Sequence, residues 1–181
     1  ESEETLKEVK KEIEKLIKRA EEINRESAER LKRILEEWKK EVDRSEKRLR
    51  EVLDEVRRRR NTEEVEKVIR EVEELVKRSR DKVRKIEKEV RDLLKESTDE
   101  LKRIVEEIEE AVRDIERKLR AGKRDRRELL EELKRVLDRL KKLIDDDRRK
   151  NEKVLRDLEK LMREDADENR EVLKRLEDKA R

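Results

Sequence analysis

The sequence predicts an all-α fold, a straight antiparallel three-helix bundle whose very long helices run up, down and up. Three observations predict it: apolar residues recur every 18 positions, only two short segments interrupt the helical pattern, and the 181 residues include no Pro and a single Gly. Eighteen residues make five turns of an ideal α-helix. An apolar stripe of this period therefore follows one line along the helix and does not wind around it.

The first predicted helix covers residues 2–60. Ser2 is a suitable N-cap, and the two glutamates after it place negative charge where the helix dipole favours it. Along this helix Ile13, Leu31 and Leu49 are separated by 18 residues each. The apolar stripe therefore returns to the same face throughout the helix.

Two short segments predict the other helix boundaries. Asn61 is a C-cap and Thr62 an N-cap, which places a sharp turn between the first and second helices. Gly122 ends the second helix, and Asp125 with Glu128 forms a capping-box-like pair that starts the third. Connections this short make neighbouring helices antiparallel. The predicted helices cover residues 2–60, 62–121 and 125–180.

The 18-residue period continues through the second and third helices. It relates Val65, Val83, Leu101 and Leu119 in the second helix and Leu140, Leu158 and Leu176 in the third. At about 1.5 Å per residue, each helix is expected to be about 85–90 Å long. We expect the three helices to form one domain over residues 1–181.

The composition excludes several classes of function. Charged residues make up 62% of the chain and apolar residues 30%, as in some disordered segments, but the regular apolar spacing argues against disorder. Without Cys or His the usual disulfides and transition-metal ligands are missing, and we expect no cofactor. Acidic and basic residues are interspersed with a net charge of +3, so we expect no nucleic-acid or membrane-surface binding. We also expect no membrane-spanning or targeting segment.

Polar residues interrupt the apolar stripe at the same 18-residue spacing. They are Ser27, Ser45, Ser79, Ser97, Asp147, Asn151, Asp165 and Asn169. Ser27 and Ser97 lie equally far from residues 61–62, to within one residue, and Ser97 and Asp147 equally far from residue 123, to within two. Ser45 and Ser79 lie equally far from residues 61–62, and Ser79 and Asp165 equally far from residue 123, within the same limits. They predict two layers, one of Ser27, Ser97, Asp147 and Asn151 and the other of Ser45, Ser79, Asp165 and Asn169.

We interpret each layer as a buried hydrogen-bond network. An ionised Asp offers only acceptors, whereas Ser hydroxyls and Asn amides can donate to it. Such a network is tolerable only when its members are satisfied, because each orphaned group costs about 1–3 kcal/mol. Sliding one helix by a turn would set a carboxylate against leucine, so the expected role of the network is to specify register and topology.

A catalytic or metal-binding interpretation of the same residues is weaker. A nucleophilic serine needs a base such as His or Lys beside it, and neither lies on the stripe at these layers. Calcium sites draw several carboxylates from an irregular loop, whereas these residues lie in mid-helix. We therefore predict no enzyme and no metal site. Asn24 is interpreted as a residue at the boundary of the stripe, and Trp38 as a packing residue of the core.

The 18-residue repeat, the two minimal turns, the restricted set of amino acids and the Ser/Asn/Asp layers together resemble de novo designed helical bundles built on parametric backbones with buried hydrogen-bond networks. The resemblance covers all 181 residues. It implies a hyperstable, monomeric scaffold with no natural substrate.

Two alternatives to a self-sufficient scaffold remain open. The stripe is doubled once per repeat, at Leu16/Ile17, Ile34/Leu35 and Val52/Leu53. If the doubled positions face outward, the chain is a helix-binding or self-associating module, such as one component of a designed oligomer or heterodimer. A pH-responsive device that uses Asp147 and Asp165 is a weaker alternative, since His, the usual switch near neutrality, is absent.

Overall fold

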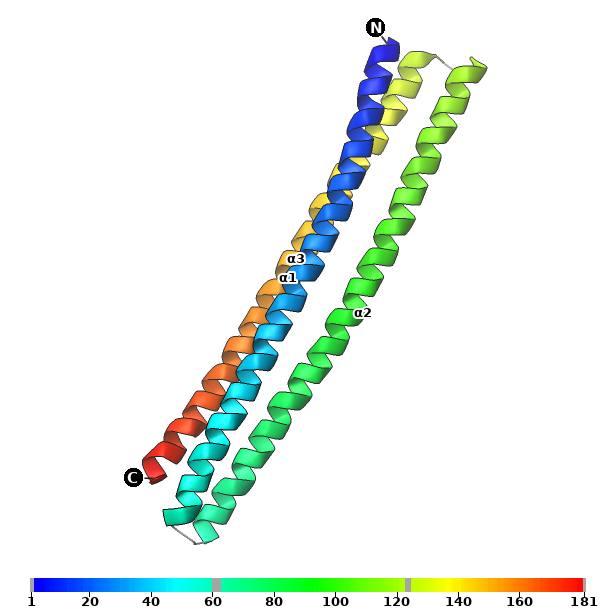
Figure 1. The fold of residues 1–181 in the computed structure, drawn as a ribbon. Coiled ribbons are helices and arrows are strands. Elements are labelled where there is room, and N and C mark those ends of the chain that lie inside the picture. The colour runs from blue at the N-terminus through cyan, green and yellow to red at the C-terminus, as the bar shows by residue number, and fades with distance from the viewer. Residues whose placement is uncertain (1, 60–62, 123–124, 181) are drawn as a thin grey trace. The chain divides into compact units, whose positions relative to one another are not determined.

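The computed structural model describes residues 2–59, 63–122 and 125–180 (Figure 1). These residues form three α-helices, α1 (Ser2–Arg59), α2 (Glu63–Ala121) and α3 (Arg126–Ala180), and contain no strand. The all-α three-helix prediction is confirmed, and the helix bounds agree with the predicted ones to within a residue. The caps predicted at Asn61 and Thr62 lie outside the described residues.

The residues that flank the turn between α2 and α3 show the predicted glycine C-cap and an N-cap at Asp125, but among the described residues the Glu128 side chain does not complete the predicted capping box. Gly122 follows the last residue of α2 with a φ of 61°, a left-handed conformation that glycine adopts without steric cost. Its backbone N–H donates to the carbonyl oxygen of Leu119 at 3.3 Å. Asp125 precedes α3, and its Oδ1 accepts a hydrogen bond from the backbone N–H of Arg127 at 3.3 Å, as expected of an N-cap.

The chain divides into two compact units, each of which contains a segment of all three helices. Unit 1 consists of Glu1–Glu29 and Leu93–Lys153, and unit 2 consists of Arg30–Asp92 and Val154–Arg181. The 18-residue repeat places one of the two predicted polar layers in each unit. Each unit is described by itself below.

Both units are closed around an apolar core. In each unit, the apolar stripe residues of the α1 segment pack with those of the α2 and α3 segments. The buried residues include Ile13, Ile108, Leu129 and Leu140 in unit 1 and Leu49, Val56, Val72 and Leu176 in unit 2. Full burial of such a side chain contributes about 1.5–3 kcal/mol, so these cores hold the helices together.

Ion pairs and hydrogen bonds show the helix directions within each unit. In unit 1 Lys10 pairs with Glu116, whereas Asn24, further along α1, bonds to Ser97, earlier in α2. In unit 2 Lys39 pairs with Glu87 and the later Glu46 with the earlier Arg80. The α1 and α2 segments are therefore antiparallel in both units, as predicted.

Candidate functional site

A cluster of polar side chains lies in the core of unit 2, and all three helices contribute to it. The unit 2 cluster consists of Trp38 on α1, Ser79 on α2, and Asp165 and Asn169 on α3, all of which are at most 6% exposed. The indole N–H of Trp38 donates to Oδ2 of Asp165 at 3.0 Å. The Ser79 hydroxyl lies 2.9 Å from Oδ1 of the same carboxylate. Each Asp165 oxygen therefore has its own donor.

The side chains of this cluster meet because of their helical spacing. Asp165 and Asn169 are one turn apart and lie on the same face of α3. The Ser79 hydroxyl is also 3.5 Å from Oδ1 of Asn169, but a hydroxyl has one proton, and the shorter distance favours Asp165 as the acceptor. The cluster thus joins α1, α2 and α3 of unit 2 at a single carboxylate.

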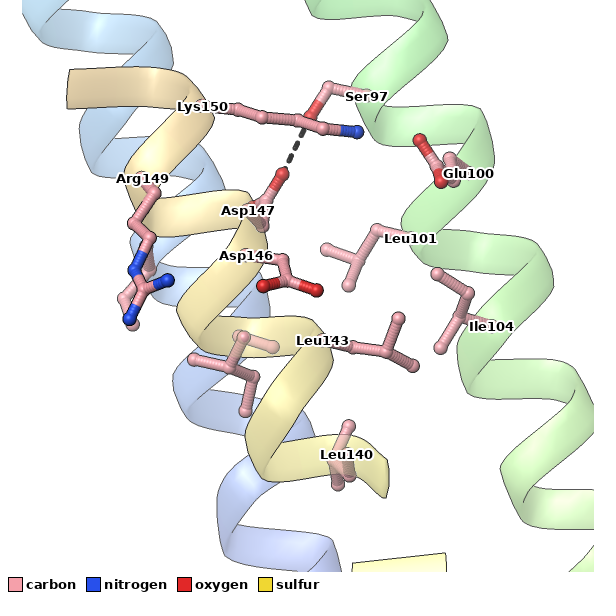
Figure 2. Close-up of a pocket in the computed structure, with 13 residues that line it drawn as sticks. Ser97, Glu100, Leu101, Ile104, Leu140, Leu143, Asp146, Asp147, Arg149 and Lys150 are labelled. Atoms are coloured by element: carbon pink, nitrogen blue, oxygen red, sulfur yellow. Dashed lines mark hydrogen bonds between the residues drawn. The ribbon is translucent and has the colours of Figure 1, made fainter. Parts of the chain in front are cut away.

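The corresponding cluster in unit 1 is less complete. The unit 1 cluster consists of Asn24 on α1, Ser97 and Thr98 on α2, and Asp147 on α3. The Ser97 hydroxyl lies 3.1 Å from Oδ1 of Asn24 and 3.4 Å from Oδ1 of Asp147. Asn24 in turn donates through Nδ2 to Oγ1 of Thr98 at 3.3 Å. Figure 2 shows the Asp147 side chain extending from α3 towards Ser97.

Two acceptors share one proton in the unit 1 cluster. Because Ser97 can donate to only one of them at a time, the nearer Asn24 competes with Asp147. Burial raises the pKa of Asp147 above its ordinary value of 3.8, and the negative charge of Glu100 adds to this effect, while the Ser97 hydroxyl and Lys150 oppose it. Ionisation of Asp147 is therefore less favourable in the folded chain than in the unfolded chain.

Three of the eight residues predicted to form the networks have no side-chain hydrogen bond among the described residues. Ser27 and Ser45 are half-buried, and neither has a hydrogen bond within the part of the chain that the structure describes. Asn151 is 7% exposed, and its Nδ2 is buried without a partner among the described residues. The structure thus brings Ser97 and Asp147 together in one layer, and Ser79, Asp165 and Asn169 in the other.

Two residues of the clusters make hydrogen bonds that the sequence analysis does not predict. Asn24 was expected at the boundary of the stripe, but it is 9% exposed and bonds to Ser97 and Thr98. Trp38 packs in the core as expected, at 1% exposed, and also donates to Asp165. The layers were defined by counting residues from the two turns, and the same count places Asn24 level with Asp147. The sequence therefore contained a signal for this residue.

Outside the clusters, unit 2 holds a carboxylate that two arginines pair with closely. Glu46 on α1 is half-buried and accepts hydrogen bonds from Arg80 on α2 and Arg50 on α1. Burial alone would raise the pKa of Glu46, but the hydrogen bonds and charges of Arg80 and Arg50 together outweigh it and lower the pKa below its ordinary value of 4.5. Glu46 and Asp147 are therefore shifted in opposite directions.

The chemistry open to these clusters is limited. The described residues contain no grouping of three or more Asp, Glu, His or Cys side chains that could hold a metal ion. Among the described residues, the only titratable groups hydrogen-bonded to Ser79 and Ser97 are aspartates, which are weak bases for activating a hydroxyl. The arrangement is suited to holding helices in register.

Comparison of the chain with protein-family models, with curated proteins and with solved structures gives no match. Among the helices as described, none has a stretch that is long and apolar enough to cross a membrane.

Ser79 and Ser45 test whether the hydrogen bonds of the unit 2 cluster stabilise the fold. Ser79→Val removes a donor from the buried Asp165 carboxylate, so we expect it to lower the free energy of unfolding by about 1–3 kcal/mol. Ser45→Val is the matched control, because Ser45 belongs to the same predicted layer without a hydrogen bond among the described residues. Urea denaturation of both variants measures the difference, and equal losses of stability would contradict the assignment.

The opposite pKa shifts predict opposite pH dependences. A carboxyl whose pKa is raised on folding contributes stability that is present below its unfolded pKa and lost as pH rises through the folded value. From neutral pH down towards pH 3.8, the parent should therefore gain stability relative to Asp147→Asn. Relative to Glu46→Gln it should lose stability as pH falls through and below 4.5, because the pKa of Glu46 is lowered. Urea denaturation across this pH range measures both stability differences. If the two differences changed in the same direction as pH falls, the account would be refuted.

Proposed function

We propose that this protein is a designed structural scaffold, a helical bundle without a substrate whose polar clusters between the helices specify the register of those helices. The observation that carries the proposal is the Asp165 carboxylate, which is 3% exposed and receives one hydrogen bond from α1 and one from α2. A binding or catalytic carboxylate needs a face left open to its ligand. Both oxygens of Asp165 are already occupied by side chains of the same unit.

Displacement of α1 or α2 would take one of the two donors away from this carboxylate. Leu75 and Val83 lie one turn to either side of Ser79 on α2, and both are buried. A slip of α2 by one turn in either direction would bring an apolar side chain to the carboxylate in place of the Ser79 hydroxyl. A buried charge without its partners costs several kcal/mol, so the slipped arrangement is strongly disfavoured.

The designed origin is supported by the agreement among all levels of the sequence. Helix propensity, capping, apolar period and polar placement favour the same structure, as they do in idealised designs. The 18-residue repeat relates residues in all three helices, and its two polar layers fall in separate units. On this proposal the chain is a monomer with a very high melting temperature.

A second candidate function is a module that binds a partner helix or a second copy of the chain. Several apolar residues of unit 1 are only half-buried, among them Leu101 and Ile104 on α2 and Leu143 and Ile144 on α3. In unit 2 Leu161 is 38% exposed. The doubled positions on α1 do not all agree. Ile17, Leu35 and Leu53 are buried within their own units, which favours the scaffold. Leu16 and Ile34 are only half-buried, which leaves some apolar surface for a partner.

A combined variant tests the scaffold proposal. In Trp38→Phe/Ser79→Val/Asp165→Leu/Asn169→Leu the whole unit 2 cluster becomes apolar and no donor or acceptor is orphaned. We expect its stability to urea to equal or exceed that of the parent, since replacing a complete buried polar group by packed apolar residues is often neutral or stabilising.

The same samples should be examined by sedimentation equilibrium over a range of concentrations. The scaffold proposal expects the mass of one chain, 22.3 kDa, for the parent. A mass that rises to a multiple of this value would favour the interaction module. A combined variant that is much less stable than the parent would show that the polar residues are needed for more than register.

A further inference from the structure

The 18-residue repeat allows the two units to be compared position by position. Asp147, Ser97 and Asn151 of unit 1 correspond to Asp165, Ser79 and Asn169 of unit 2, each at a shift of 18 residues. The same shift relates Ala20 on α1 of unit 1 to Trp38 on α1 of unit 2. Unit 1 therefore has the acidic layer of unit 2 but a methyl group at the position of its indole ring.

Unit 1 contains a cavity at this position. Its volume is about 440 Å³, and Ala20 lines it together with the polar side chains of Ser97 and Asp147. Its apolar walls include Ile23 on α1, Ile104 on α2 and Leu140 on α3, while Glu100 and Lys150 also border it. Figure 2 shows Leu101 and Ile104 of α2 and Leu143 of α3 around the space beside the Asp147 carboxylate. Cavities of about 300–1,000 Å³ with mostly apolar walls and a few polar groups are typical ligand sites.

The Asp147 carboxylate also lacks the donor that Trp38 supplies in unit 2. Oδ2 of Asp165 accepts the indole N–H, whereas Oδ2 of Asp147 has no hydrogen-bond donor among the residues that the structure describes. Its Oδ1 shares the single Ser97 proton with Asn24. The cavity thus combines an apolar space with a half-buried carboxylate oxygen that receives no hydrogen bond from the described residues.

We propose that the cavity of unit 1 binds a small planar aromatic molecule with one N–H group, of the indole class. The ring occupies the space beside Ala20 that the Trp38 ring fills in unit 2, and the N–H donates to the Asp147 carboxylate. The apolar walls supply the hydrophobic contribution to affinity, and the hydrogen bond selects aromatic N–H donors over plain hydrocarbons.

Titration of the full chain with 5-fluoroindole, followed by ¹⁹F NMR, tests the proposal without interference from the absorbance of Trp38. We expect saturable binding of one equivalent and displacement by unlabelled indole. Benzofuran has the same shape but no N–H, so it should displace the probe at least about tenfold less effectively. Absence of saturable binding would overturn the proposal, and equal potency of benzofuran would overturn the assignment of Asp147 as the acceptor.

Two variants locate the site. Ala20→Trp should fill the cavity and abolish binding of 5-fluoroindole, whereas Trp38→Ala should open the equivalent space in unit 2 and raise the stoichiometry from one equivalent to two. Ala28→Trp is the matched control on α1, since Ala28 is half-buried but does not line the cavity, and it should bind like the parent. Unchanged binding by Ala20→Trp would place the probe elsewhere and overturn the proposal.

Circular dichroism establishes that each variant is folded. If Ala20→Trp does not fold, the smaller Ala20→Leu substitution takes its place and should weaken binding of the probe at least severalfold. Binding by Ala20→Leu that equals that of the parent would likewise overturn the proposal.

Discussion

On the scaffold proposal, the buried Asp165 carboxylate is the constraint on which the arrangement of unit 2 depends. A charge at a core position costs several kcal/mol unless donors satisfy it. Here the donors are the indole N–H of Trp38 and the hydroxyl of Ser79, which come from the two other helices. The apolar stripe brings the helices together without choosing a register strongly, since leucine packs acceptably at several heights. We propose that the carboxylate adds this choice of register, because a one-turn slip of α1 or α2 takes one of its donors away.

Unit 1 shows what happens when the same carboxylate has different neighbours. Ala20 and Asn24 stand where unit 2 has Trp38 and Val42, so an indole donor is lost and a competing acceptor is gained. The consequences are a Ser97 proton that two acceptors share and a cavity beside Asp147. Nδ2 of Asn151, which has no partner among the described residues, adds a cost of about 1–3 kcal/mol. The polar layer of unit 1 is therefore the less stabilising of the two, although its backbone positions follow the same repeat.

The helices could be predicted from the sequence because each rests on a local signal. The 18-residue period indicates the buried face. Gly122 marks the end of α2, and Asp125 marks the start of α3. The membership of the polar clusters was harder to predict, because the period gives the height and the face of a residue but not the direction of its side chain. Ser27 and Ser45 share the heights of their layers and still have no hydrogen bond among the described residues.

Asn24 and Trp38 were underestimated for different reasons. Asn24 has no polar counterpart 18 residues away, so a search for repeated polar positions passes over it. Trp38 is large and apolar enough to be explained by packing alone, and its N–H matters only because Asp165 lies within 3.0 Å of it. The division of the chain into two compact units is a property of its three-dimensional contacts that no single segment of sequence indicates.

The central claim is that the polar cluster fixes helix register, and the most direct test is a distance measurement between α2 and α3 of unit 2. The chain has no Cys, so spin labels can be attached at cysteines introduced at the exposed positions Asp81 and Arg163 alone. Pulsed electron paramagnetic resonance should give one narrow distance distribution for the otherwise unchanged chain. In the variant with an apolar unit 2 cluster it should give a broader distribution or further peaks, because a slip of one turn moves α2 by about 5.4 Å. An equally narrow distribution in both proteins would show that the apolar core sets the register without the polar cluster.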